Sequence, residues 1–231
     1  MGFVGNALNP AAKVDAKMTD LSPDVTIFRR FRLRYVVLGF AAIALVAFVL
    51  FVHPFLAVTK RVNADVLVVE GWIPDYMFPA AAREFRDGHY AIMLVSGLQP
   101  DPADHSGASP DFAHAATELK KAGVPAQQLI ECPAPFARWL RTSKTARAVR
   151  LKTDQAGLNY HGVNVITAGP HARETWVAYE HAFGKKAPVG IISVPKTNYP
   201  ANRWWLNRQG LVWVPKDFVA WLKEVIFGLR S

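Results

Sequence analysis

The stretch that decides the fold is VNVITAGPHAR, Val163–Arg173. It opens with an apolar VNVI run typical of a buried strand and continues through a turn of small residues that begins at Thr167. Pro170 suits the start of a helix, so His171 and Arg173 fall in the first helical turn. Free backbone N–H groups at a helix N-terminus favour an anion. The sequence therefore predicts a ligand site at this junction.

Around this stretch, apolar strands alternate with amphipathic helices. Besides the opening stretch, strands are predicted at Ala64–Trp72, Ala91–Gly97, Leu129–Glu131 and Val189–Val194. Helices are predicted at Asp75–Arg86, Phe112–Ala122, Thr142–Gln155 (capped by Thr142 or Ser143), His171–Phe183 and Lys216–Leu229, with a long loop at Leu98–Asp111 and a short element at Arg203–Arg208. This alternation predicts an α/β domain over residues 63–231, with a Rossmann-like, doubly wound and mainly parallel sheet. We expect the aromatic face of the last helix to pack on that sheet, the alternative being contact with a bilayer.

One membrane-spanning helix is predicted ahead of this domain. Residues 1–34 are predicted to be a basic cytoplasmic tail, without regular structure up to residue 27 and ending in RRFRLR. The uncharged run Tyr35–Val58 follows, interrupted only by His53 and Pro54, and is long enough to span a hydrocarbon core. A buried core helix and a cleaved signal peptide are the alternatives. Because the basic residues are concentrated before the span, the positive-inside rule predicts a single-pass inner (plasma) membrane protein with a periplasmic or extracellular C-terminal domain.

The composition of the chain limits which kinds of function fit it. The net charge is +9, and more than half of it lies in the first 61 residues, beside the apolar run. This distribution fits membrane topology and anionic lipid better than nucleic acid, for which no recognition motif is present. Cys132 is the single cysteine, so an internal disulfide is excluded. His, Asp and Glu show no metalloenzyme spacing, so no metal site is predicted. Neither Walker A nor G-x-G-x-x-G occurs, so the sequence carries no nucleotide-binding fingerprint.

Polar residues gather where the predicted strands end. Glu70 and Gly71 follow the first strand, Ser96 and Gly97 follow the second, and Thr167, His171 and Arg173 follow the opening stretch. Carboxyl ends of parallel strands form one edge of the sheet, where ligands bind. We expect His171 to be a general acid or base, Arg173 to bind a phosphate or carboxylate, and Glu70 to accept from a sugar hydroxyl or act as a base.

Each of these residues also has a structural interpretation. Glu70 can cap the following turn or pair with Arg173, Ser96 can bond to backbone in a tight turn, and His171 can be exposed. Ser96, His171 and Glu70 are the residue types of a hydrolase triad, but the G-x-S-x-G elbow is missing. The catalytic candidates are therefore these three residues, and whether the protein is an enzyme stays open.

The order of several motifs resembles the SanA/ElyC/YdcF-like family of bacterial domains. These motifs are Ala64–Val69, Ser96-Gly97, Gly123-Val124-Pro125, Thr142–Thr145, Ile166–Arg173 and Trp204-Trp205. The resemblance implies a Rossmann-like sheet, a role in envelope integrity or surface-polysaccharide assembly, and site groups at Ser96, Gly97, Thr145, Thr167, His171 and Arg173. The chain departs from the family at Glu70-Gly71-Trp72, where relatives have a glycine-rich turn, and at Lys144–Ala148, where an Asn-Thr-x-Glu-Asn run is reduced.

Three functions follow as hypotheses. The first is a membrane-anchored domain that binds or processes a small anionic or sugar-containing metabolite of the cell envelope, with Glu70, Ser96 and His171 as catalytic candidates. Its ligand would contact Gly71, Gly97, Thr145, Thr167 and Arg173. The second is a non-catalytic scaffold for envelope-assembly proteins. The third is binding of a nucleotide-like cofactor such as S-adenosylmethionine.

Overall fold

The computed structural model describes residues 23–107 and 109–228, with side chains from residue 34 onward. The chain divides into two compact units, Met1–Val46 and Ala47–Ser231. Helix α1, Pro23–Leu56, contains a 23-residue stretch, Arg34–Leu56, with the length and composition of a membrane span. Only 6% of its most apolar window is buried within the chain, unlike a core helix. The first 22 residues of the predicted tail lie outside the described residues, and α1 runs unbroken across the predicted boundary at residue 34.

The second unit is built on a five-stranded sheet in which all paired strands are parallel, as predicted. The strands are β1 (Val66–Glu70), β2 (Ile92–Leu98), β3 (Leu129–Ala134), β4 (Val163–Ala168) and β5 (Val189–Val194). Their order is β3-β2-β1-β4-β5. The chain therefore reverses its direction of winding between β1 and β4, and this is the switch point at which open α/β sheets bind ligands.

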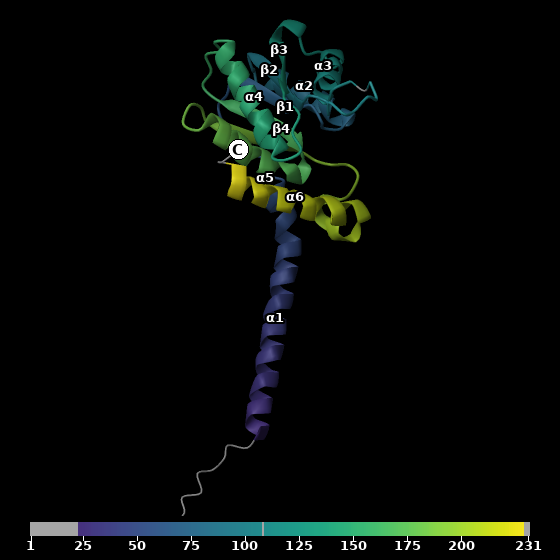
Figure 1. Cartoon of the computed structure of the whole chain (residues 1–231), viewed down its shortest axis with the longest axis vertical. Helices are drawn as coiled ribbons and strands as arrows, with labels where there is room; N and C mark the ends of the chain where they lie inside the picture. The colour runs from purple at the N-terminus through teal and green to yellow at the C-terminus, as the bar shows by residue number, and fades with distance from the viewer. Residues whose placement is uncertain (1–22, 108, 229–231) are drawn as a thin grey trace, which may run out of the picture. The chain divides into compact units, whose positions relative to one another are not determined.

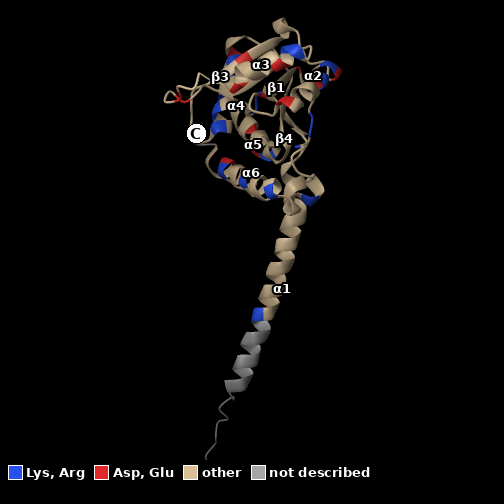
Figure 2. Cartoon of the chain, turned by 90° about the vertical axis from the view of Figure 1, so that its right-hand side faces the viewer, with Lys and Arg blue, Asp and Glu red and all other residues tan. Residues whose placement is uncertain are grey.

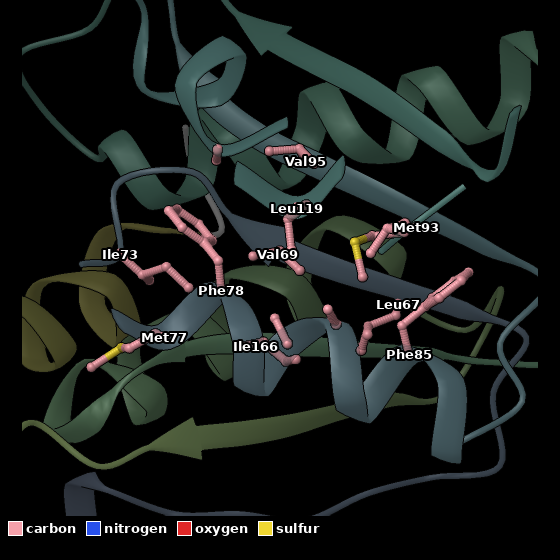
Figure 3. Packing of buried hydrophobic residues seen from close by; sticks show 14 of the residues in the cluster. Leu67, Val69, Ile73, Met77, Phe78, Phe85, Met93, Val95, Leu119 and Ile166 are labelled. Atoms are coloured by element: carbon pink, nitrogen blue, oxygen red, sulfur yellow. The ribbon is translucent and has the colours of Figure 1, made fainter. Parts of the chain in front are cut away.

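Helices cover both faces of the sheet (Figure 1). Helices α2 (Phe78–Asp87) and α3 (Asp111–Lys121) pack on one face, where Leu67 and Val69 of β1 point, as Figure 3 shows. Helices α4 (Arg141–Gln155) and α5 (Ala172–Phe183) cover the other face, where Val66 and Val68 point. Because both faces are buried, the strands are mostly apolar instead of alternating between apolar and polar residues.

Short 3₁₀ turns complete the predicted framework. They are η1 (Asp75–Met77), η2 (Ala126–Gln128), η3 (Gly169–His171) and η4 (Ala201–Leu206). The predicted helix starting at Asp75 thus begins as η1, and the helix after β4 begins with η3 because Pro170 opens it. Gly169 adopts φ +52°, and a Cβ there would lie 3.1 Å from Cγ of Lys196. Glycine is therefore required for this turn on two counts.

A third layer is formed by α6 (Arg208–Phe227), which lies beside α5 in Figures 1 and 2. It begins eight residues before the predicted start at Lys216, because Asn207 caps it with bonds from the N–H groups of Gln209 and Gly210. The expectation that α6 packs on the sheet is wrong: it packs mainly on α5, η3 and η4. Its buried residues include the carboxylates Asp217 and Glu224.

The prediction that Thr142 or Ser143 caps α4 is also wrong. The N-cap is Leu140, which has φ +48° and no side-chain capping bond. Thr142 and Ser143 lie within the first turn, two and three residues after Leu140, and donate instead to Glu174 Oε1 (3.0 Å) and Glu224 Oε1 (2.6 Å). The two hydroxyls that the local sequence assigns to capping thus donate hydrogen bonds to buried carboxylates of other helices.

The chain entering the domain is held by the buried side chain of Asn164 on β4. Its Oδ1 accepts from the Val62 N–H at 3.0 Å, and its Nδ2 donates to the Val62 carbonyl and to the Tyr90 hydroxyl, both at 2.9 Å. Lys60 forms an isolated antiparallel bridge with Ile191 of β5. The segment after α1 is therefore hydrogen-bonded to the sheet edge and is not a free linker.

Candidate functional site

The carboxyl ends of β1 and β4 are joined by a buried carboxylate. Glu70, the last residue of β1, is 1% exposed, and its Oε2 accepts from the hydroxyl of Thr167 on β4 and from that of Thr175 on α5. The bond to Thr175 is 3.2 Å long. Burial raises the pKa of the Glu70 carboxyl, while His171 and the Thr167 hydroxyl act in the opposite direction.

A pocket of about 1180 Å³ opens over this edge. Five predicted site residues line it, namely Glu70, Ser96, Gly97, Thr145 and His171, whereas Gly71, Thr167 and Arg173 are not among its lining residues. The strand ends provide the floor. The remaining walls come from the segment that leads into α4 and from α6.

His171 lies at the centre of a cluster of acidic side chains. Its Nδ1 is 3.2 Å from Glu174 Oε2 and 3.7 Å from Asp217 Oδ1, and its Nε2 is 4.0 Å from Glu70 Oε2. The Thr142 hydroxyl lies 3.5 Å from Nε2, and the ring of Trp72 packs edge-on at 4.7 Å between centroids. His171 is therefore a largely buried ring that contacts residues of several elements. The alternative that His171 is an exposed first-turn residue is wrong.

The protonation of His171 is set by these carboxylates. Burial alone lowers the pKa of the imidazole, but Glu174, Asp217 and Glu70 outweigh burial and raise the pKa of His171 to about 9. The ring is thus a cation at neutral pH. A group in this state can donate a proton or a hydrogen bond, but it is not available as a general base.

Lys196 extends the same cluster. Its Nζ is 3.4 Å from Asp217 Oδ2, and both side chains are largely buried. Two cations, His171 and Lys196, therefore share three buried carboxylates at the pocket floor. The aliphatic chain of Lys196 packs against Gly169, so the position of this ammonium depends on the turn after β4.

Ser96 does not form a triad with His171. The residue is 1% exposed, and its hydroxyl accepts a 3.2 Å bond from the buried hydroxyl of Tyr179 on α5. Among the described residues, no bond between Ser96 and either His171 or Glu70 occurs. Ser96 lines the pocket floor, and Tyr179, not a base, is its partner there.

The two glycines predicted to bind a ligand make room for protein. A Cβ on Gly71 would lie 2.8 Å from the Cα of Phe112, and one on Gly97 would lie 3.0 Å from the Phe112 Cβ. The start of α3 thus packs directly on the ends of β1 and β2. Gly71 also donates its N–H to the carbonyl of Ser96 at 2.7 Å, which continues the pairing of β1 with β2. The position of Gly71 is explained by this close approach.

Arg173 lies away from the pocket. Its Nε donates to the carbonyl of Phe55 at 2.8 Å, and its guanidinium stacks over the rings of Phe55 and Trp176. It also makes no ion pair with Glu70, the pairing that the sequence left open. Arg173 therefore joins α5 to the end of α1, within the second unit. It is not one of the residues that line the pocket.

Thr145 and Leu140 contribute the wall next to α4. The Thr145 hydroxyl donates to the carbonyl of Thr142 at 3.0 Å, so its predicted binding group is already bonded within the helix. Leu140 lines the pocket in a left-handed conformation, φ +48°. Non-glycine residues adopt this conformation rarely, and such strain occurs often at functional sites.

Basic and aromatic side chains occupy further lining positions. The bases are Arg138, Arg141, Lys216 and Lys223, and the aromatic rings are Trp72, Trp139 and Trp213. Lys216 Nζ lies 4.4 Å from the Trp213 ring centre and Lys223 Nζ 5.3 Å from that of Trp139. Arg138 is paired with Asp101 at 3.1 Å. The pocket thus combines an acidic floor that holds two cations with exposed lysine and arginine side chains.

Sequence reasoning missed Glu174, Asp217 and Lys196. Glu174 lies three residues after His171, a spacing that puts two residues on one helix face. The contact between Glu174 and His171 could therefore have been predicted from the sequence. Asp217 and Lys196 come from α6 and the segment after β5, and no local pattern links them to His171.

No group of three or more His, Cys, Asp or Glu side chains among the described residues is arranged to hold a metal ion. No protein-family model matches the chain, and no curated protein matches it at a significant level.

Proposed function

We propose that the protein is anchored in the plasma membrane by α1 and that its α/β domain binds a small anionic or sugar-containing metabolite of the cell envelope. The observation that carries this proposal is the pocket over the β1–β4 switch point, with the His171 cation at its floor and exposed bases among its lining residues. Basic side chains attract phosphate or carboxylate, and tryptophan rings pack on sugar faces or apolar groups.

His171 is the proton-transfer group of this proposal. As a buried imidazolium it would act as an acid, donating a proton or a hydrogen bond to a ligand oxygen. Glu70, Glu174 and Asp217 would position it and keep it protonated. Ser96 and Thr145 are retained as residues that shape the pocket, because their hydroxyls already have protein partners.

The orientation with the domain outside the cytoplasm rests on the arginines before the span. The resemblance to SanA/ElyC/YdcF-like domains is compatible with an envelope role and stays a prediction. The order of strands in this sheet is compatible with that resemblance, but many unrelated functions share the same fold.

Binding is tested with glucose 1-phosphate, a probe that is both anionic and sugar-containing. The full chain in detergent micelles is titrated by calorimetry, and Arg141→Ala and Lys223→Ala are each expected to weaken binding about fivefold. Lys120→Ala, which removes an exposed lysine of α3 outside the pocket lining, is the matched control and should leave affinity unchanged. Equal affinity for all four proteins would contradict the proposed binding site.

The role of His171 is tested in the host. A strain that carries His171→Gln at the wild-type protein level is expected to admit a membrane-impermeant dye, as a strain lacking the gene would. The alternative of a non-catalytic scaffold predicts normal dye exclusion for His171→Gln. Normal exclusion at a normal protein level would therefore favour the scaffold over the binding proposal.

A further inference from the structure

Helix α6 buries two carboxylates beside Val214 and exposes a stripe of apolar side chains. Its inward face carries Asp217 and Glu224, which are 5% and 0% exposed. The opposite face carries a stripe of exposed apolar side chains at the helical spacing i, i+3, i+4, namely Leu211, Val212, Val219, Leu222 and Ile226. Each of these five is between 41% and 59% exposed. A surface helix of a domain in water normally turns its apolar residues inward.

Both inward carboxylates have partners within the domain, and these partners explain why this face of α6 points inward. Glu224 Oε1 accepts from Ser143 of α4, and Asp217 is paired with Lys196. Since these bonds fix the rotation of α6, the apolar stripe must face away from α5. Burying the stripe inside the domain would require breaking both of them.

The end of the apolar helix α1 packs against α6 within the second unit. Phe48 meets Phe218 and Phe55 meets Trp221, with ring centres 5.2 and 5.0 Å apart. Val52 lies in one hydrophobic cluster with Phe218 and Trp221. Because residues up to Leu56 belong to the candidate membrane span, α6 contacts the part of the chain that would leave the bilayer. Phe218 and Trp221, each next in sequence to a residue of the stripe, thus contact a segment of membrane-spanning composition.

Lysines and tryptophans accompany the stripe. Lys216, Lys223 and Trp213 are exposed on α6, and Trp221 is half-buried there. Figure 2 shows blue, basic segments along this helix. Lysine is attracted to anionic headgroups, and tryptophan prefers the interfacial depth of a bilayer. A second copy of the chain would present the same positive charge, which disfavours a self-associated pair.

We infer that α6 is an interfacial helix, whose exposed apolar stripe docks on the surface of the bilayer that α1 spans. This inference rests on the membrane anchoring given under the proposed function. It does not depend on the ligand. Since Ala220 and Lys223 of α6 line the pocket, docking would hold the pocket beside the lipid headgroups.

The test uses the full chain in nanodiscs of phosphatidylcholine and phosphatidylglycerol. Cys132→Ser removes the single cysteine, and an environment-sensitive fluorophore is attached at Leu222→Cys or Ile226→Cys. Leu151→Cys, on α4 and 60% exposed, is the matched control for leucine exposure. Ile43→Cys, in the apolar part of α1, reports the anchoring itself.

Doxyl-labelled lipids are expected to remove about half of the emission from labels at 222 and 226, and of that at 43, but none at 151. Quenching at 43 without quenching at 222 and 226 would overturn the docking and leave the anchoring standing. No quenching at 43 would overturn the anchoring and the docking together. A blue-shifted label at 222 that lipid does not quench would indicate a protein occupant, and it would overturn the bilayer as the partner.

Discussion

Glu70 at the end of β1 accepts a hydrogen bond from Thr167 at the end of β4, and this bond crosses the switch point of the sheet. The carboxylate also accepts from Thr175 and faces the His171 cation at 4.0 Å. One buried group thus connects the two halves of the fold to the charge at the pocket floor.

Removing this carboxylate is expected to destabilise the domain. Glu70→Ala leaves the hydroxyls of Thr167 and Thr175, both 0% exposed, without their acceptor, and it should cost about 3 kcal/mol of unfolding free energy. Denaturant unfolding of the full chain in micelles measures this. Glu180→Ala, at an exposed position on α5, should change stability by less than about 0.5 kcal/mol. Similar small losses for both variants would contradict the role given to Glu70.

Stability should fall as the pH rises toward 9. The pKa of His171 is raised from 6.5 to about 9 in the folded protein, so its contribution is complete below pH 6.5 and is lost as the pH passes through about 9. The loss is expected to be at most roughly 3 kcal/mol, because one pKa unit corresponds to about 1.4 kcal/mol. Unfolding of wild type and His171→Gln at a series of pH values measures it. A slope that is equally steep in His171→Gln would assign the effect to other groups.

The bond between α4 and α6 should contribute measurably to stability. Ser143→Ala removes the donor that lies 2.6 Å from the fully buried Glu224, and a cost of about 2 kcal/mol is expected. Thr117→Ala removes a hydroxyl that bonds to an exposed helical carbonyl, and it should cost far less. If both substitutions lower the unfolding free energy equally, the Ser143–Glu224 bond does not stabilise the packing of α6.

Replacing Leu140 is expected to stabilise the domain, unlike the substitutions above. Leu140→Gly relieves a left-handed backbone conformation and should raise the unfolding free energy by about 1 kcal/mol, while it removes an apolar lining group and weakens probe binding. His89→Gly relieves a similar φ of +54° outside the pocket lining and should stabilise without changing binding. Destabilisation by Leu140→Gly would show that its side chain contributes more than its strain costs.

Most of the sheet could be predicted because four of its strands are mainly apolar runs beside turn-forming residues. The exception is β3, which continues to Ala134, past the predicted end at Glu131. The prediction for β5, Val189–Val194, matches its observed bounds, and β1 and β2 differ from prediction by a few residues at their ends. These strands are buried on both faces, so their composition alone indicates a parallel sheet.

The charge cluster could not be predicted in full, because its members come from distant parts of the chain. Position relative to a strand end identified Glu70 and His171, but the partners Asp217 and Lys196 depend on how α6 rotates on α5. Local sequence also misled at Arg173 and Thr142. Each has the residue type for its expected role, and each is used by a partner that is close only in the folded chain.

The central claim is that His171 is a cation held by three carboxylates at the pocket floor, and its titration tests this most directly. NMR of the imidazole ring in full-length protein with labelled histidine, assigned by comparison with His171→Gln, follows its protonation across pH 5 to 10. We expect a midpoint near 9, and a lower midpoint in Asp217→Asn because one stabilising carboxylate is lost. A midpoint at or below the ordinary histidine value of 6.5 would contradict it.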